Sequence, residues 1–105
     1  MKPVMGPIAM RRVGLGLRAL GHCAPGSFYF HDPTYFAFVD PYGEWRAVPI
    51  TTTKPPPRGW WWNGDEALPT LTPSIRIVDP EGWHGFITEG VMLSCSDSGN
   101  QAVPQ

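Results

Sequence analysis

The side chains that could do chemistry are few, and no recognised motif joins them. His84 follows Trp83, and the run Ser94-Cys95-Ser96 offers one thiol and two hydroxyls. The spacing assigns no base to these nucleophiles, and the G-x-S-x-G turn of one large class of hydrolases is absent from the sequence. A histidine beside a tryptophan is more often a hydrogen-bonded sheet residue than a catalytic base. The sequence therefore predicts that the protein is not an enzyme.

Metal and phosphate sites are not indicated either. Cys23 and Cys95 are the two cysteines, and neither a CxxC pair nor an HExxH helix motif occurs. We expect two reduced, partly buried thiols, and the sequence leaves open whether they lie close together. Gly14 and Gly16 form only a short glycine pair, without the pattern of a phosphate-binding loop. We expect no metal and no cofactor.

Charge and hydropathy narrow the classes of partner. Eight basic residues face nine acidic ones, which gives a net charge of −1 and disfavours general nucleic-acid binding. No apolar run approaches the roughly 18 residues of a membrane span, and no secretory signal is recognised. We expect a cytoplasmic protein that does not bind membranes.

Composition indicates the fold class. Thirteen prolines and twelve glycines interrupt any long helix, while 42% hydrophobic residues are too many for a disordered chain. The prediction is a mostly β, small single-domain antiparallel sheet or meander with turn-rich, proline-rich connections and little helix.

The chain divides into five stretches by their pattern. Residues 34–40 and 44–50 predict a hairpin around the turn Pro41-Tyr42-Gly43, and strands near 75–78, 83–88 and 91–95 predict a meander. Alternation of Val13, Leu15 and Leu17 with small residues favours a strand or an irregular arm over a helix. The predicted stretches are an N-terminal arm or strand (1–25), an aromatic hairpin (26–50), a proline-rich connector (51–57), a tryptophan segment with a C-terminal meander (58–95), and a loose tail (96–105).

Residues 58–74 are the most distinctive stretch. Three consecutive tryptophans end in Asn63-Gly64, the strongest short signal for a tight turn. Alternation along a strand would place Trp60 and Trp62 on one face and Trp61 on the other. We expect an aromatic strand, a tight turn and an extended return.

Binding explains the aromatic excess better than catalysis. Five tryptophans of 150–250 Å² each are difficult to bury in so small a domain, and exposed tryptophan and arginine are frequent in binding hot spots. We predict an aromatic platform on Trp60 or Trp62, with a charged lip nearby. Such a surface suits a host protein, or equally a stacked nucleobase with Arg58 or Arg76 reaching its phosphate. The candidate binding residues are Arg58, Trp60, Trp62, Asn63, Asp65, Glu66, Arg76 and His84.

Part of this pattern is similar to a known family. The quoted residues are Trp60-Trp61-Trp62-Asn63-Gly64, Pro69-Thr70, Pro73-Ser74 and His84-Gly85-Phe86-Ile87-Thr88-Glu89-Gly90. They resemble small bacteriophage and prophage proteins of unknown function that carry a W-x-W-N-G…P-T-x-x-P-S block, over residues 38–104. That family also has a CxxC knuckle, whose positions are Val39 and Tyr42 here. Of its apparent zinc-ribbon set only His84 and Cys95 remain, so the resemblance does not imply a metal in this chain.

The resemblance gives the functional prediction its context. We expect a phage-encoded protein that acts in the bacterial host cytoplasm. It would bind a host bacterial protein or complex and inhibit a defence component, as anti-CRISPR and other anti-defence proteins do. In a near variant it would sequester a signalling nucleotide. One alternative is a degenerate zinc-ribbon-like structural or virion-assembly module. Another is a small hydrolase that uses His84 and Cys95. An unpaired strand edge would also favour a homodimer.

Overall fold

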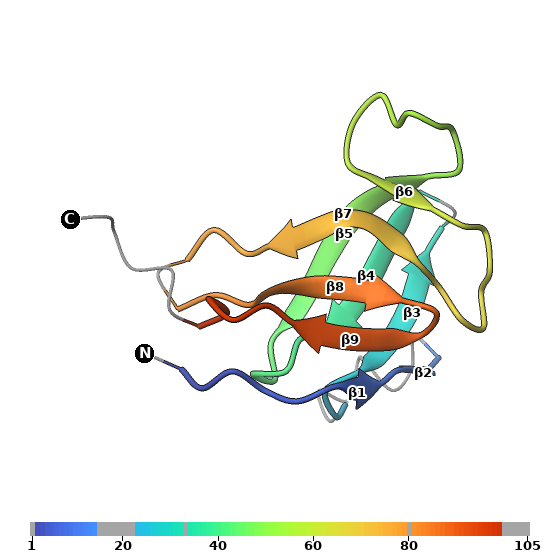
Figure 1. The fold of residues 1–105 in the computed structure, drawn as a ribbon. Coiled ribbons are helices and arrows are strands. Elements are labelled where there is room, and N and C mark those ends of the chain that lie inside the picture. Colours follow the sequence, from blue (N-terminus) through green and yellow to red (C-terminus); the bar gives the residue numbers. More distant parts are fainter. Residues whose placement is uncertain (1, 15–22, 33, 80, 100–105) are drawn as a thin grey trace.

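The protein is built from nine short strands (Figure 1). The computed structural model describes residues 2–14, 23–32, 34–79 and 81–99, and it shows no helix within them. The expected mostly β fold is confirmed, and no described segment forms a helix that is long and apolar enough to cross a membrane. The strands are β1 (Ile8–Ala9), β2 (Arg11–Arg12), β3 (Ser27–His31), β4 (Tyr35–Val39), β5 (Trp45–Thr51), β6 (Trp60–Trp62), β7 (Leu71–Arg76), β8 (His84–Thr88) and β9 (Val91–Ser94).

The strands form one sheet that nearly closes on itself. Their order is β1-β9-β8-β7-β6-β5-β4-β3-β2, so the two outermost strands are neighbours in sequence, separated by Met10. Ile8 pairs with Met92 on one side, and Arg12 pairs with Phe28 on the other. The N-terminal arm therefore bridges the two ends of the sheet, and β7, β8 and β9 face β3, β4 and β5 across the interior (Figure 1). Closure of this kind protects strand edges.

The predicted hairpin is present as β4 and β5. Phe36 pairs with Val48, and the chain turns between the two strands with Gly43 at a φ of +90°. Asp40 organises this turn from a fully buried position. Its carboxylate accepts the backbone N–H of Tyr42 at 2.8 Å and the Nε–H of Arg46 at 3.0 Å. A buried carboxylate is tolerated here because it has a cation and N–H donors around it.

The tryptophan segment differs from its prediction in two respects. β6 runs parallel to β5, because the proline-rich connector carries the chain back before β6 begins, and only then does β7 return antiparallel. The prediction of a tight turn at Asn63-Gly64 is wrong. The connection is the longer loop 63–70, in which the side-chain oxygen of Asn63 accepts N–H groups from Asp65 and Thr70, both at 3.1 Å.

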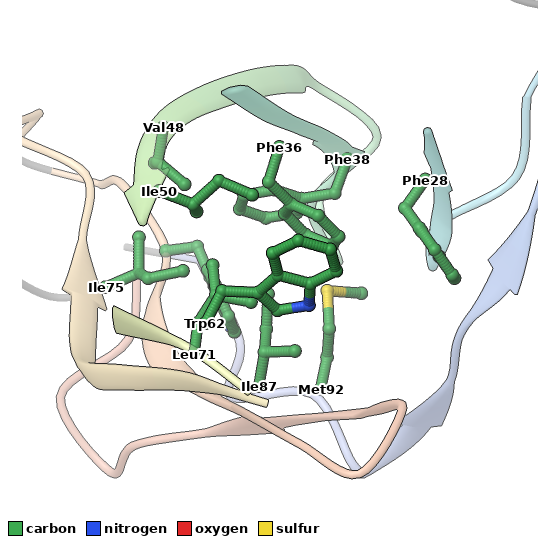
Figure 2. Close-up of a cluster of buried hydrophobic side chains, with 11 residues drawn as sticks. Phe28, Phe36, Phe38, Val48, Ile50, Trp62, Leu71, Ile75, Ile87 and Met92 are labelled. Atoms are coloured by element: carbon green, nitrogen blue, oxygen red, sulfur yellow. The ribbon is translucent and has the colours of Figure 1, made fainter. Parts of the chain in front are cut away.

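Aromatic and aliphatic side chains fill the space between the two halves of the sheet. Trp83 is completely buried and Trp62 is 9% exposed, whereas Trp45, Trp60 and Trp61 are half-buried. Figure 2 shows the Trp62 indole in the middle of these side chains. The cluster comprises Phe28, Phe36, Phe38, Val48, Ile50, Trp62, Leu71, Ile75, Trp83, Ile87 and Met92.

The prediction that Trp62 belongs to an exposed platform is therefore wrong. The alternation along β6 is as predicted, but the side that carries Trp62 faces inward, where its ring lies 4.8 Å from the Phe30 ring between centroids. Trp60 also packs against the core, and it is Trp61 that faces outward with the Lys54 ammonium 4.5 Å above its ring. A closed sheet surrounds its interior with side chains from both halves, so it can bury more aromatic side chains than one face of a flat meander can.

The start of the expected loose tail is firmly held. Ser98 is fully buried, and its hydroxyl accepts the backbone N–H of His84 at 3.1 Å. The Gly99 N–H donates to the Gly82 carbonyl at 2.9 Å. Residues 96–99 are thus part of the packed structure, because their polar groups have partners inside it. Residues 100–105, and positions 15–17 of the expected N-terminal strand, lie outside the described residues.

Candidate active site

A bulge in β7 places Ser74 next to β8. Leu71 pairs with Ile87 and Ile75 pairs with Gly85, so β7 uses four residues where β8 uses two. The surplus residues leave the regular ladder and change the direction of the side chains on the bulged strand. Ser74 lies on this bulge and is half-buried, while Ile75 after it points into the core. Bulges of this kind are frequent beside active sites because they redirect a side chain.

Ser74, His84 and Asp97 form a continuous hydrogen-bonded chain. The Ser74 hydroxyl lies 3.2 Å from Nε2 of His84, and Nδ1 of the same ring lies 2.6 Å from Oδ1 of Asp97. An ionised carboxylate can only accept, so Nδ1 carries the proton and Nε2 is left to accept the serine hydroxyl. This is the arrangement of a nucleophile, a base and the group that orients the base.

The backbone around His84 fixes the direction of its ring. His84 begins β8, where its N–H donates to the Ser98 hydroxyl and its carbonyl accepts the Cys95 N–H at 2.8 Å. The Ser98 N–H then donates to the Cys95 carbonyl at 2.9 Å and closes a turn directly after β9. That turn carries Asp97 to the side of the imidazole. The base and its acidic partner are therefore positioned by the same short set of bonds.

Asp97 is kept ionised by its neighbours. The hydrogen bond from His84 is the largest cause that lowers its pKa below the usual value, and the positive charge of Arg76 adds to it. Nη2 of Arg76 lies 2.8 Å from Oδ2, so the two carboxylate oxygens have different partners. The Arg76 and Asp97 side chains are 53% and 44% exposed, which places this end of the chain at the molecular surface.

Trp60 supports the nucleophile from the neighbouring strand. Its indole Nε1–H donates to the backbone carbonyl of Ser74 at 3.2 Å. We predicted Trp60 as a ligand-binding residue, but in the structure its polar edge holds the serine backbone while its ring packs against the core. A tryptophan that is buried on one side and hydrogen-bonded on the other is well suited to restrict the position of a strand.

Cys95 lies beside the chain but is chemically less suited to act. Burial, and secondly the charge of Asp97, raise the pKa of its thiol, so the reactive thiolate is scarce at neutral pH. Donor atoms of His84, Cys95 and Asp97 lie within 4.8 Å of one another. Three donors are fewer than the four of a structural zinc site, and Asp97 already pairs with Arg76. Both cysteines are free.

The predicted binding residues fall into three groups. Arg76 and His84 come together at the hydrogen-bonded chain just described, and Trp60 borders it. Trp62 lies in the core.

The other four predicted residues lie in or beside loops. Asp65 accepts the N–H groups of Ala67 and Leu68, both at 2.9 Å, and Glu66 pairs with Arg12 at 2.6 Å. Arg58 is exposed and lines a pocket with Tyr35 and Pro49, and Asn63 is exposed in the loop that follows β6.

Sequence reasoning missed the two residues that complete the chain with His84. Ser74 stood inside the quoted P-T-x-x-P-S block without a role, and Asp97 was assigned to a loose tail. The sequence did contain one signal. Ser74 directly follows the segment between Pro69 and Pro73, and a histidine comes ten residues later. No pattern in the sequence indicated the acidic partner, because it follows the last strand.

Comparison with known families now bears on this geometry. The family model described as bacterial ubiquitination-like system serine protease (BubE) matches residues 18–95. The chain belongs to the BubE family. Ser74 and His84 lie within the matched residues, and Asp97 lies two residues beyond them. Searches of curated proteins and of solved structures gave no match.

Membership of the BubE family corrects two predictions. The expectation that the protein is not an enzyme is wrong, because the family is one of serine proteases. The expected role as a phage-encoded inhibitor of host defence is also wrong, since the family indicates a protease-related role. The first error arose because strand pairing brings Ser74 beside His84, and no spacing along the sequence indicates that contact. The resemblance to phage proteins and the host partner stay predictions.

Proposed function

We propose that this BubE-family protein is a serine hydrolase that cleaves peptide bonds, with Ser74 as the nucleophile, His84 as the general base and Asp97 as the residue that orients the base. The observation that supports this most is the unbroken chain from the Ser74 hydroxyl through both ring nitrogens of His84 to Asp97. Its order along the sequence carries little weight, because such triads occur in several chain orders on unrelated folds and are recognised by geometry.

In the acylation step, the Ser74 oxygen attacks the carbonyl carbon of the scissile bond. Nε2 of His84 takes the hydroxyl proton as the oxygen–carbon bond forms, and the imidazolium is stabilised by ionised Asp97. The tetrahedral intermediate then collapses. The carbon–nitrogen bond breaks, Nε2 gives its proton to the leaving amine, and the acyl group remains as an ester on Ser74.

Deacylation repeats the same transfers with water. Nε2 of His84 takes a proton from a water molecule, and the resulting hydroxide attacks the ester carbonyl. The new intermediate releases the carboxylic acid, and the proton returns from His84 to the Ser74 oxygen. The first and the last proton transfers use the 3.2 Å contact between the serine oxygen and Nε2, which lies at the long end of the range for a base and its nucleophile without substrate.

The structure favours Ser74 over Cys95 as the nucleophile. Ser74 is the residue whose hydroxyl reaches Nε2 of His84, whereas burial and Asp97 raise the thiol pKa of Cys95. The alternative suggested by the sequence, a hydrolase that uses His84 and Cys95, is therefore replaced by one that uses His84 and Ser74.

Covalent labelling tests this proposal directly. A fluorophosphonate probe should form an adduct at Ser74 that peptide mass spectrometry locates, and Ser74→Ala and His84→Ala should each abolish it. The matched control is Ser96→Ala, which removes an exposed serine close to the site and should leave labelling unchanged. Labelling at another serine, or equal labelling of the Ser74→Ala variant, would contradict the assignment.

A further inference from the structure

Two large apolar side chains lie exposed beside the proposed triad. Phe86 of β8 and Leu93 of β9 are 45% and 41% exposed. They pair directly across the two strands, so their side chains touch the same small area of the outer surface. Their neighbours Ile87 and Met92 point into the core. An exposed Phe–Leu pair on a sheet of this size is a candidate contact surface.

The strand geometry places this pair on the face that carries the catalytic groups. His84 and Phe86 are two residues apart on β8 and point outward, on opposite sides of buried Gly85. His84 pairs with Arg76 and Gly85 pairs with Ile75, so the next residue of β8, Phe86, lies alongside the bulge that holds Ser74. Phe86 therefore flanks both the nucleophile and the base on the outer surface of β7 and β8.

Any polypeptide that reaches the Ser74 oxygen must lie over this face. Residues two apart on a strand are separated by about 6.8 Å, which is the same spacing that an extended substrate has. A side chain within two residues of the scissile bond would therefore lie over Phe86 and Leu93. Covering the two exposed side chains with a third apolar one removes apolar area from water on both partners, which favours binding.

We propose that Phe86 and Leu93 form the substrate-binding surface of this enzyme and select polypeptides that carry a large apolar side chain within two residues of the scissile bond. This inference rests on the function proposed above for Ser74, His84 and Asp97, and it adds the class of substrate. The occupant is the substrate chain because the surface is continuous with the nucleophile. A second copy of the protein on the same surface would block access to Ser74.

A library of internally quenched peptides, randomised on both sides of the scissile bond, tests the preference. The wild-type protein should favour Leu, Met or Phe at one position within two residues of the cut. Phe86→Ser/Leu93→Ser should reduce kcat/KM for the best peptide by about tenfold, chiefly through KM, as lost apolar contacts do in other enzymes. Hydrolysis of p-nitrophenyl acetate by the same double variant should fall by a much smaller factor than peptide hydrolysis, because the acetate ester has no such side chain. Val78→Ser, which removes another exposed apolar residue, should change neither rate.

A charged variant gives a gain of function that misfolding cannot produce. Phe86→Arg should move the preference at the same position from apolar to acidic residues. An unchanged preference in Phe86→Arg, or a wild type without any apolar preference, would overturn the substrate surface while acetate hydrolysis still supports the triad. A wild type that neither hydrolyses the acetate ester nor takes the fluorophosphonate label would overturn the proposed function and this inference together. A wild-type dimer that Phe86→Ser/Leu93→Ser converts to monomers would assign the surface to a second copy instead.

Discussion

Nδ1 of His84, the first residue of β8, lies 2.6 Å from Oδ1 of Asp97, which follows the end of β9. The two residues are 13 positions apart in the sequence. Their contact depends on the β8–β9 pairing and on the turn that Ser98 closes. It sets the tautomer of His84, so that Nε2 is the ring nitrogen that faces the Ser74 hydroxyl.

Asp97→Asn should reduce kcat for a peptide substrate by about 10³–10⁴-fold, because the neutral amide can support the wrong tautomer of His84 and cannot stabilise the imidazolium. Steady-state rates at pH 8 measure the effect. Asp79→Asn, at an exposed carboxylate that lies 3.6 Å from Arg46, is the control and should keep the wild-type rate. An active Asp97→Asn enzyme would show that another group orients the base.

Asp97 should also make stability depend on acid pH. Its folded-state pKa is lowered from 3.8, so its contribution to the free energy of unfolding is present above pH 3.8 and is lost as the pH falls through the lower folded value. Urea unfolding should show wild type more stable than Asp97→Asn at pH 7, with the difference shrinking below pH 3.8. A difference that stays constant down to pH 2 would contradict the linkage.

Arg76→Gln should have a much smaller effect than the loss of Asp97. The guanidinium holds Oδ2 of Asp97, but both side chains are about half exposed, and pairs of that kind contribute at most about 1 kcal/mol. We expect kcat to fall by no more than about fivefold, with partial recovery in Arg76→Lys. A loss as large as that of Asp97→Asn would mean that Arg76 contacts the substrate.

Gly85→Ala should destabilise the protein by about 1–3 kcal/mol, as overpacking does. A Cβ atom at Gly85 would clash with the Trp83 ring and with the Leu93 carbonyl oxygen, so β8 and β9 would have to separate. Gly6→Ala is the matched control, because its Cβ would meet nothing within 4 Å. Urea unfolding of both variants measures the difference, and equal midpoints would refute the close approach.

Trp62→Ala should cost about 3–5 kcal/mol, the usual range for emptying a large aromatic site in a core. Trp61→Ala should cost much less, because Trp61 faces outward and contacts Lys54, a contact worth about 0.5–1 kcal/mol. Thermal unfolding of the two variants ranks them. The opposite ranking would restore the idea that Trp62 belongs to an exposed platform.

The strands themselves follow from local sequence. Alternation from Tyr35 to Val39 and again after Glu44, with Gly43 in the turn, predicts the β4–β5 hairpin, and the same logic predicts β8 and β9 at nearly their observed bounds. For β7 it predicts residues 75–78, whereas the strand runs from Leu71 to Arg76. These elements need only the two-residue period of a strand and residues that accept turn geometry. Neighbouring strands joined by short turns then pair with each other.

The proposed active site depends on contacts between residues that are far apart in the sequence. Ser74 meets His84 because a bulge shifts the register of β7 against β8, and Asp97 meets His84 because a turn follows β9. A register shift reverses which side chains face each other, and no local pattern records it. Closure of the sheet by the N-terminal arm likewise turned Trp62 inward. Alternation and turn residues were enough to predict the hairpin and the C-terminal strands, whereas the loop 63–70 and the neighbours of each side chain depended on long-range pairing.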